Sequence, residues 1–249
     1  MELPPLGPVI GSGKEAEVFD CGALVVKLYR ATAAAPKRAA FREASILALV
    51  EALGLPAPVV HAVGQAGGRW GIAMTRADGP PLADVIRRPG PMQPCLDRMA
   101  RLQIAIHSHP GTHLGSLKTR LAANIGRAAM PDEALRRRLL DGLAALPEGD
   151  RLCHGDFHPW NILGAPGREV VVDWLDACAG DPAADVCRSY VLIRPVAPDL
   201  ADAYVEAYSA ASGGNRNRVL AWLPFVAAAR LAEGVPAETE ALLAMAGAS

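Results

Sequence analysis

The chain has 249 residues, of which 51% are hydrophobic and 20% are charged, a composition typical of a folded globular protein and not of a disordered or fibrous one. Its 25 Lys and Arg residues stand against 26 Asp and Glu residues, so the formal net charge is −1. A chain this close to neutral has no overall charge to attract nucleic acid or an anionic membrane. We therefore expect neither partner, and any phosphate chemistry must come from locally placed charges.

Targeting signals and cysteine usage point to a cytoplasmic protein. The N-terminus shows no basic stretch followed by an apolar run, and no apolar run approaches the ~18 residues that span a bilayer. The five cysteines are odd in number and have no C-x-x-C spacing, which argues against a disulfide framework and a zinc ribbon. The sequence carries no signal for an oligomeric state.

The first eighty residues are predicted to form short strands and one helix. The β-branched, apolar run Leu24–Tyr29 is the strongest strand signal. A helix is expected from Pro36 to Leu53, because proline suits the first turn and Gly54 suits the stop. The other expected strands are 6–11, 17–19, 59–63 and 70–75. The turn residues at 78–81 predict a boundary, with one lobe at 1–78 and a second at 79–249.

The remainder of the chain is predicted to be mainly helical. Helical spacing is found at 82–88, 94–107, 117–129, 131–145, 182–193, 199–211 and 216–232. One segment, 151–173, interrupts this pattern with a polar, histidine-rich loop followed by two short apolar runs around a Gly-Ala-Pro-Gly turn at 164–167. It predicts a β-hairpin inside a helical lobe.

This interruption contains the residues best suited to chemistry. His154-Gly155-Asp156 is followed by Asn161, and Asp173 stands at the end of the expected hairpin. Phosphoryl transfer from ATP needs a carboxylate near the attacking hydroxyl and oxygen ligands for Mg²⁺. The D-x-x-x-x-N spacing is that of a kinase catalytic loop. We therefore predict Asp156 as the catalytic residue and Asn161 and Asp173 as metal ligands.

The same segment resembles the aminoglycoside phosphotransferase family, a branch of the protein-kinase-like fold that also contains choline, homoserine and fructosamine kinases. The family's loop reads H-G-D-x-x-x-x-N, with Gly155 where protein kinases have arginine, and its metal motif is similar to Val172-Asp173-Trp174. The resemblance is specific in this central third only. It implies an α+β, protein-kinase-like two-lobed fold, with an N-terminal antiparallel sheet and one helix in a nucleotide-binding lobe, and a mainly helical catalytic and substrate-binding lobe.

The N-terminal half offers the nucleotide-binding residues that the resemblance requires. Gly11, Ser12 and Gly13 can form a loop over phosphates, although they depart from G-x-G-x-x-G. Lys27 lies in a run close to the V-A-I-K pattern, and a lysine in a buried strand is costly unless it is paired. It is the candidate for the α- and β-phosphates, although it could also be an edge-strand lysine whose amine reaches water.

The resemblance also implies a helix glutamate that orients the lysine, and Glu43 occupies that place. The alternative for Glu43 is an ordinary solvated helix charge. The run 72–79 resembles the linker between the lobes of this family. Met74 would then lie behind the adenine, while the carbonyl of Thr75 and the N–H of Ala77 would pair with its edge.

Two further residues follow from the family pattern near the loop. The run 180–186 resembles the family's G-D-P-x-x-D segment, which places the carboxylate of Asp185 on the backbone of His154 and Gly155. The competing interpretation is an exposed acid at a helix start. His107 would close a helix that packs under the loop.

The sequence therefore predicts an ATP- and Mg²⁺-dependent phosphotransferase that acts on a small-molecule hydroxyl. The alternatives are a nucleotide-binding pseudokinase or scaffold, a protein Ser/Thr kinase, and a kinase of a metabolite such as choline, homoserine or a sugar. The intact set of Lys27, Asp156, Asn161 and Asp173 argues against a pseudokinase. Residues 195–249 hold six acids and three arginines, a net of −3 that favours a cationic substrate.

Overall fold

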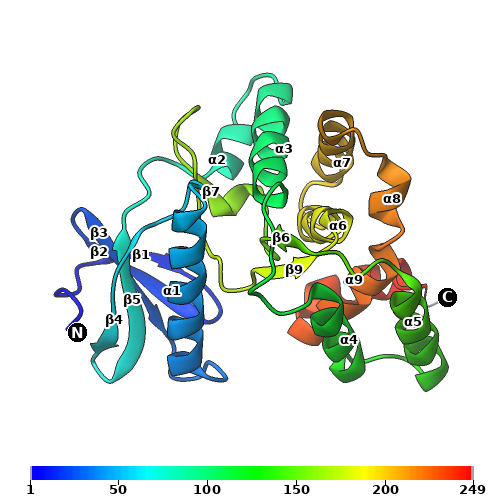
Figure 1. The fold of residues 1–249 in the computed structure, drawn as a ribbon, viewed down its shortest axis with the longest axis horizontal. Helices are drawn as coiled ribbons and strands as arrows, with labels where there is room; N and C mark the ends of the chain where they lie inside the picture. Colours follow the sequence, from blue (N-terminus) through cyan, green and yellow to red (C-terminus); the bar gives the residue numbers. More distant parts are fainter. Residues whose placement is uncertain (1, 248–249) are drawn as a thin grey trace. The chain divides into compact units, whose positions relative to one another are not determined.

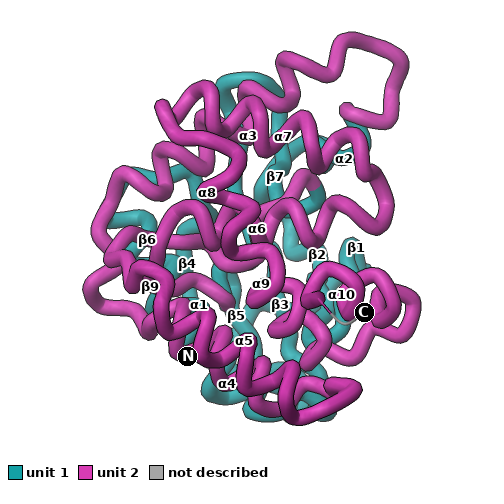
Figure 2. Tube along the Cα trace, turned by 90° about the vertical axis from the view of Figure 1, so that its right-hand side faces the viewer, with its two compact units in different colours: residues 1–85, 160–175 teal, residues 86–159, 176–249 magenta. Residues whose placement is uncertain are grey.

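The computed structural model describes residues 2–247 and divides them into two compact units (Figure 2). Unit 1 contains residues 1–85 and 160–175, and unit 2 contains residues 86–159 and 176–249. The segment 160–175 belongs to unit 1 although it stands in sequence between the two segments of unit 2. The predicted boundary between a nucleotide-binding lobe and a catalytic lobe at residues 78 and 79 stays a prediction, because the two compact units are defined by packing and not by function.

Unit 1 is built on a five-stranded antiparallel sheet in the order β1-β2-β3-β5-β4. The strands are β1 (Val9–Ser12), β2 (Ala16–Cys21), β3 (Leu24–Tyr29), β4 (Val60–Ala66) and β5 (Arg69–Thr75). Helix α1 (Pro36–Ala52) packs along this sheet (Figure 1). The strand predicted at 24–29 and the helix predicted from Pro36 are confirmed.

Alternation along β3 decides which side chains meet the helix. Val26 and Leu28 pack with Leu3 and Ala73 in an apolar cluster. Because side chains of a strand point to alternate faces, Lys27 lies on the opposite face, where α1 covers the sheet. A lysine is thereby placed beneath a helix, in a position where it needs a partner.

A small hairpin completes unit 1. Strands β7 (Ile162–Leu163) and β8 (Val170–Val171) pair antiparallel, as the sequence predicted, and are shorter than expected. The N–H of Val171 donates to the carbonyl of Pro56 at 2.8 Å, and the N–H of Gly164 donates to the carbonyl of Pro80 at 3.2 Å. These bonds attach the hairpin to the N-terminal part of the chain.

Unit 2 is mainly helical. Its helices are α3 (Gln93–His107), α4 (Leu117–Arg127), α5 (Glu133–Ala145), α6 (Pro182–Ile193), α7 (Pro198–Ser212), α8 (Arg216–Leu220), α9 (Leu223–Arg230) and α10 (Thr239–Met245), with 3-10 turns at Leu231–Glu233 and Pro236–Glu238. The short helix α2 (Leu82–Ile86) lies where the two units join in sequence. Helices α3, α6 and α7 pack together beside the short strands β6 (Arg151–Cys153) and β9 (Cys178–Gly180) (Figure 1). A 3-10 turn at Pro159–Asn161 connects the two units.

Two features differ from the sequence prediction. The helix expected at 216–232 is broken between Leu220 and Leu223, where Pro224 starts a new helix in its first turn. The strands β6 and β9 were not predicted, because three residues are too few to show a period. All five cysteines are free, as expected. Within residues 2–247, no helix has the length and apolar character needed to cross a membrane.

Candidate active site

Unit 1 brings three of the predicted site residues into one charged cluster. The Lys27 amine lies 2.9 Å from Oε1 and 2.8 Å from Oε2 of Glu43, and 2.7 Å from Oδ1 of Asp173. The Glu43 side chain is 1% exposed, whereas that of Asp173 is 45% exposed. The helix glutamate is therefore a buried partner of the lysine and not a solvated charge, while the aspartate faces outward.

The two carboxylates keep the lysine protonated. Burial by itself lowers the pKa of Lys27, but the charges of Glu43 and Asp173 outweigh it and hold the pKa above its ordinary value. The hydroxyl of Tyr29, two residues along β3, also donates to Glu43. The lysine is thus a fixed cation, oriented from both sides.

The hairpin places the two predicted metal ligands at one end of unit 1. Ile162 pairs with Val171, and the N–H of Val172 donates to the carbonyl of Asn161 at 2.9 Å. Asn161 and Asp173 therefore flank the same, open end of this short ladder. Asp173 has a φ of 65°, the only positive φ of a non-glycine residue among residues 2–247. A strained carboxylate at such a position is typical of a functional site.

The predicted glycine loop lies at the end of β1 and in the turn that leads into β2. The loop between β1 and β2 is closed by a bond from Gly13 N–H to the Ala16 carbonyl at 2.9 Å, and Arg30 binds Ser12 Oγ at 2.7 Å. A Cβ added at Gly11 or Gly13 would meet other atoms only at ordinary contact distances. Neither glycine is therefore required by the chain's own packing, so the tight approach that glycine permits is available to a ligand.

The predicted adenine-binding residues Met74 and Thr75 end β5, and Ala77 follows the strand. Met74 is buried, and the N–H of Thr75 is bound to the Val59 carbonyl at 2.9 Å. Within residues 2–247, the N–H of Ala77 donates to no protein group. This N–H is the donor that the sequence assigned to the adenine edge.

In unit 2, the loop that carries Asp156 is shaped by a glycine. Gly155 has a φ of +81°, and a Cβ there would clash with the carbonyl oxygen of Asp176 and lie 2.7 Å from Nη2 of Arg120. The neighbouring His154 is fully buried and accepts a bond from the Asp156 N–H at 3.2 Å. Only glycine satisfies both the conformation and the space at position 155.

A buried carboxylate holds this loop from below, as predicted. Asp185, in the first turn of α6, is 0% exposed and accepts bonds from the N–H groups of Gly155 at 2.7 Å and His154 at 3.1 Å. Gln103 donates to the same carboxylate at 2.9 Å, and His107 Nε2 lies 3.0 Å from it. Burial alone would raise the pKa of Asp185, but the hydrogen bonds and charges led by His107 hold it at about 2.

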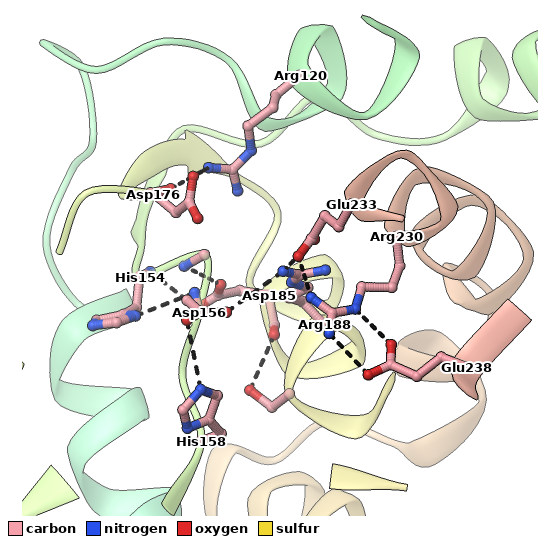
Figure 3. A network of polar contacts seen from close by, with 12 residues as sticks. Arg120, His154, Asp156, His158, Asp176, Asp185, Arg188, Arg230, Glu233 and Glu238 are labelled. Carbon is pink, nitrogen blue, oxygen red and sulfur yellow. Dashed lines mark hydrogen bonds and ion pairs between the residues drawn. The ribbon is translucent and has the colours of Figure 1, made fainter. Parts of the chain in front are cut away.

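Asp156 itself is the first member of a series of linked ion pairs (Figure 3). Arg188 Nη2 lies 3.5 Å from Asp156 Oδ1 and 2.7 Å from Glu233, which also pairs with Arg230. Burial raises the pKa of Asp156, but His158, Arg188 and His154 outweigh it and hold the pKa below its ordinary range. The carboxylate is therefore ionised at neutral pH and able to accept a hydrogen bond from a hydroxyl.

Sequence reasoning missed six residues of unit 2 that support this site. Gln103 had a usable signal, because it stands one helical turn before His107 on the same face of α3. The hydroxyls of Tyr204 and Tyr208, also one turn apart on α7, bind these two side chains. The other missed residues, Arg120, Arg188 and Glu233, come from distant elements and had no local signal.

The comparisons with known proteins agree with this arrangement. The sequence matches the phosphotransferase enzyme family over residues 8–222. No match was found among curated proteins. The fold resembles solved aminoglycoside phosphotransferases. The structure of APH(4)-Ia with ADP and hygromycin B has a TM-score of 0.71 and 18% identity, covering 96% of this chain and 90% of that one. An aminoglycoside-3′-phosphotransferase of type VIII has a TM-score of 0.65 and 20% identity, covering 91% and 92%.

A third structure, an APH(2″) enzyme with GDP and kanamycin, has a TM-score of 0.65 and 18% identity, covering 95% of this chain and 89% of that one. These likenesses confirm the protein-kinase-like α+β fold. The family match covers most of the chain, and kinases of this family use ATP with Mg²⁺. The chain thus belongs to the phosphotransferase enzyme family and is a small-molecule kinase that phosphorylates a hydroxyl group.

Proposed function

We propose that the kinase reaction uses Asp156 as the base, Lys27 as the phosphate-binding cation, and Asn161 with Asp173 as the metal ligands. The observation that carries this proposal is the Lys27–Glu43–Asp173 cluster, which ends on the same hairpin as Asn161. A half-exposed carboxylate and an amide oxygen are hard oxygen ligands of the type that Mg²⁺ prefers. The donor set therefore fits a magnesium–nucleotide complex.

Each residue then has one task. Lys27 binds the α- and β-phosphates and is kept in place by Glu43, and Gly11, Ser12 and Gly13 allow the backbone to approach the phosphates. Thr75 and Ala77 bind the adenine edge beside Met74. Bound Mg²⁺ would neutralise charge on the phosphates during transfer. Asp156 orients the acceptor hydroxyl and takes its proton. These groups act by positioning and charge stabilisation.

Which class of small molecule accepts the phosphoryl group is also part of this proposal. The solved relatives were crystallised with hygromycin B or kanamycin, which are polycations, and the net charge of residues 195–249 favours a cation in the same way. The structure weakens the charge argument, because four of the six acids there pair with arginine: Asp202 and Glu206 with Arg216, Glu233 with Arg188, and Glu238 with Arg230. A cytoplasmic location remains a proposal, supported by the five free thiols.

The test is phosphoryl transfer from radiolabelled ATP. The purified chain is incubated with ATP and Mg²⁺ and with kanamycin, hygromycin B, choline, homoserine or simple sugars, and the products are separated by mass. We expect label in one acceptor class, dependent on Mg²⁺ and lost in Asp156→Asn. Asp141→Asn, which changes an exposed aspartate of α5, is the matched control. Nucleotide binding without transfer to any acceptor would instead support the scaffold alternative.

A further inference from the structure

A small cavity lies against the catalytic loop, lined entirely by residues of unit 2. Its volume is about 50 Å³, and its polar wall includes Gly155, Arg120 and Arg188. The apolar part of the wall comes from Leu117, Leu121, Val226 and Ala229. A water needs roughly 10–15 Å³ of such space. The cavity therefore has room for one functional group of an acceptor, such as a carboxylate, and not for a sugar ring.

Each carboxylate in this wall already has bonding partners within the protein. Asp185 is bound by the loop N–H groups, Gln103 and His107. Asp176 pairs with Arg120 at 3.3 Å, and Glu233 pairs with Arg188 at 2.7 Å and also with Arg230. An ammonium group that entered the cavity would have to compete with these partners for the carboxylates and would meet the guanidinium groups of Arg120 and Arg188.

Arg188 keeps donors for a ligand. Both of its ion pairs, to Asp156 and Glu233, use Nη2. Among residues 2–247, no protein group accepts from its Nε or Nη1. The side chain is 14% exposed and is held in place by Glu233, which Arg230 fixes in turn. Pre-oriented guanidinium donors favour planar or tetrahedral oxyanions, which they can bind through two parallel hydrogen bonds.

The position of Arg188 also removes an electrostatic obstacle. An anion on the acceptor would be repelled by the Asp156 carboxylate if the two were close in a site of low dielectric constant. Arg188 lies within 3.5 Å of Asp156 and lines the cavity, so its charge is next to both groups. It can therefore compensate an acceptor anion without displacing the base.

We propose that this cavity binds an anionic group, a carboxylate or a phosphate, of the acceptor molecule, with Arg188 as its main ligand. The inference rests on the proposed function, since it assigns the acceptor of the same reaction. It predicts an acidic acceptor, for which a polycationic aminoglycoside is a poor substitute. Arg120 closes the cavity on the side of Gly155 and adds a second positive charge.

The first test uses four acceptors with one three-carbon scaffold: glycerol, glycerate, glycerol 3-phosphate and 3-amino-1,2-propanediol. We expect kcat/KM for glycerate or for glycerol 3-phosphate to exceed that for glycerol by about tenfold or more, with the amine lowest. The two acids distinguish a carboxylate site from a phosphate site. In Arg188→Gln, KM for the preferred acid should rise by about tenfold, while KM for ATP stays unchanged.

The second test measures binding without turnover. Tm is recorded at saturating ADP and Mg²⁺, so that the nucleotide site is filled, with sodium acetate, sodium phosphate or choline chloride at matched ionic strength. Acetate or phosphate should raise Tm in the native chain and in Arg137→Gln, which changes an exposed arginine of α5. The rise should disappear in Arg188→Gln and be partly retained in Arg188→Lys. If none of the four acceptors is phosphorylated, this series alone decides the proposal.

Two outcomes separate this inference from the kinase reaction itself. Phosphorylation of glycerol or the amine ahead of both acids would keep the kinase function and overturn the anionic site. The absence of an Arg188-dependent Tm shift with either anion would overturn it as well. An Arg188-dependent anion shift without transfer to any acceptor would support the site and contradict the proposed reaction.

Discussion

Two of the buried carboxylates among residues 2–247, Glu43 in unit 1 and Asp185 in unit 2, are stabilised in different ways. Glu43 depends on one cation, Lys27, which it shares with the half-exposed Asp173. Asp185 is fully enclosed and depends on backbone N–H groups, an amide and an imidazole. The Lys27 cluster can exchange partners with a ligand, because Asp173 is exposed. Asp185 cannot, because it is enclosed and held by four donors.

This difference separates ligand binding from loop architecture. Lys27 lies between two carboxylates, so the cluster has a net negative charge. Its exposed member, Asp173, can bind a metal ion, and the lysine is then available to phosphates. The Asp185 network has no such freedom, and it fixes the turn that carries Asp156. Changes in unit 1 should therefore alter nucleotide binding, and changes at Asp185 should alter stability first.

The largest effect on activity should come from Asp156, whose loop is held in place by the hydrogen bonds of Asp185. Asp156→Asn should reduce kcat by about 10²–10⁴-fold, because the base is lost while the shape is kept. The dissociation constant for ADP and Mg²⁺, measured by calorimetry, should stay near that of the native chain. A variant that turns over at the native rate would remove Asp156 from the mechanism.

Loss of the enclosed carboxylate should lower stability more than any exposed acid does. Asp185→Ala leaves two loop N–H groups and Gln103 without their acceptor, and it should lower the free energy of unfolding by about 3 kcal/mol. Urea denaturation measures this change. The control is Asp199→Ala, an exposed acid in the first turn of α7, which should cost less than about 1 kcal/mol. Equal losses in the two variants would contradict the structural role of Asp185.

Lowering the pH should weaken the hydrogen bonds of Asp185 without any mutation. The pKa of Asp185 is about 2 in the folded chain against an ordinary value of 3.8, so its ionised form stabilises the fold above pH about 4. This contribution, of about 2 kcal/mol, is lost as the pH falls from about 4 towards 2. Urea midpoints between pH 2 and 6 should therefore fall less steeply in Asp185→Asn than in the native chain. Parallel curves would assign the acid sensitivity to other groups.

The smallest effect is expected at the exposed end of the unit 1 cluster. Asp173→Asn keeps the size of the side chain and removes one charge, so Mg²⁺-dependent nucleotide affinity should fall by about tenfold. Stability should change little, because the side chain is 45% exposed and Glu43 still pairs with Lys27. Calorimetry with and without Mg²⁺ separates the two contributions. An unchanged Mg²⁺·ADP affinity would make Asp173 a structural residue only.

Much of this arrangement could be predicted because its signals are local. Three of these signals each lie within about a dozen residues: the β-branched run around Lys27, the spacing of Asp156 and Asn161, and the Gly-Ala-Pro-Gly turn. The bonds of Asp185 to the loop backbone came from a family resemblance and are confirmed. The pairing of Arg188 with Glu233 could not be predicted, since 45 residues separate them and no local pattern links the two.

The backbone at Asp173 has a consequence for how this chain evolves. A positive φ costs a non-glycine residue about 1 kcal/mol, and glycine at this position would remove that cost together with the carboxylate. Under the proposed metal-binding role of Asp173, selection for stability and selection for catalysis act in opposite directions on one codon. A gene copy that is no longer needed for catalysis should drift to glycine at position 173, so we expect this position to distinguish working copies from decaying ones.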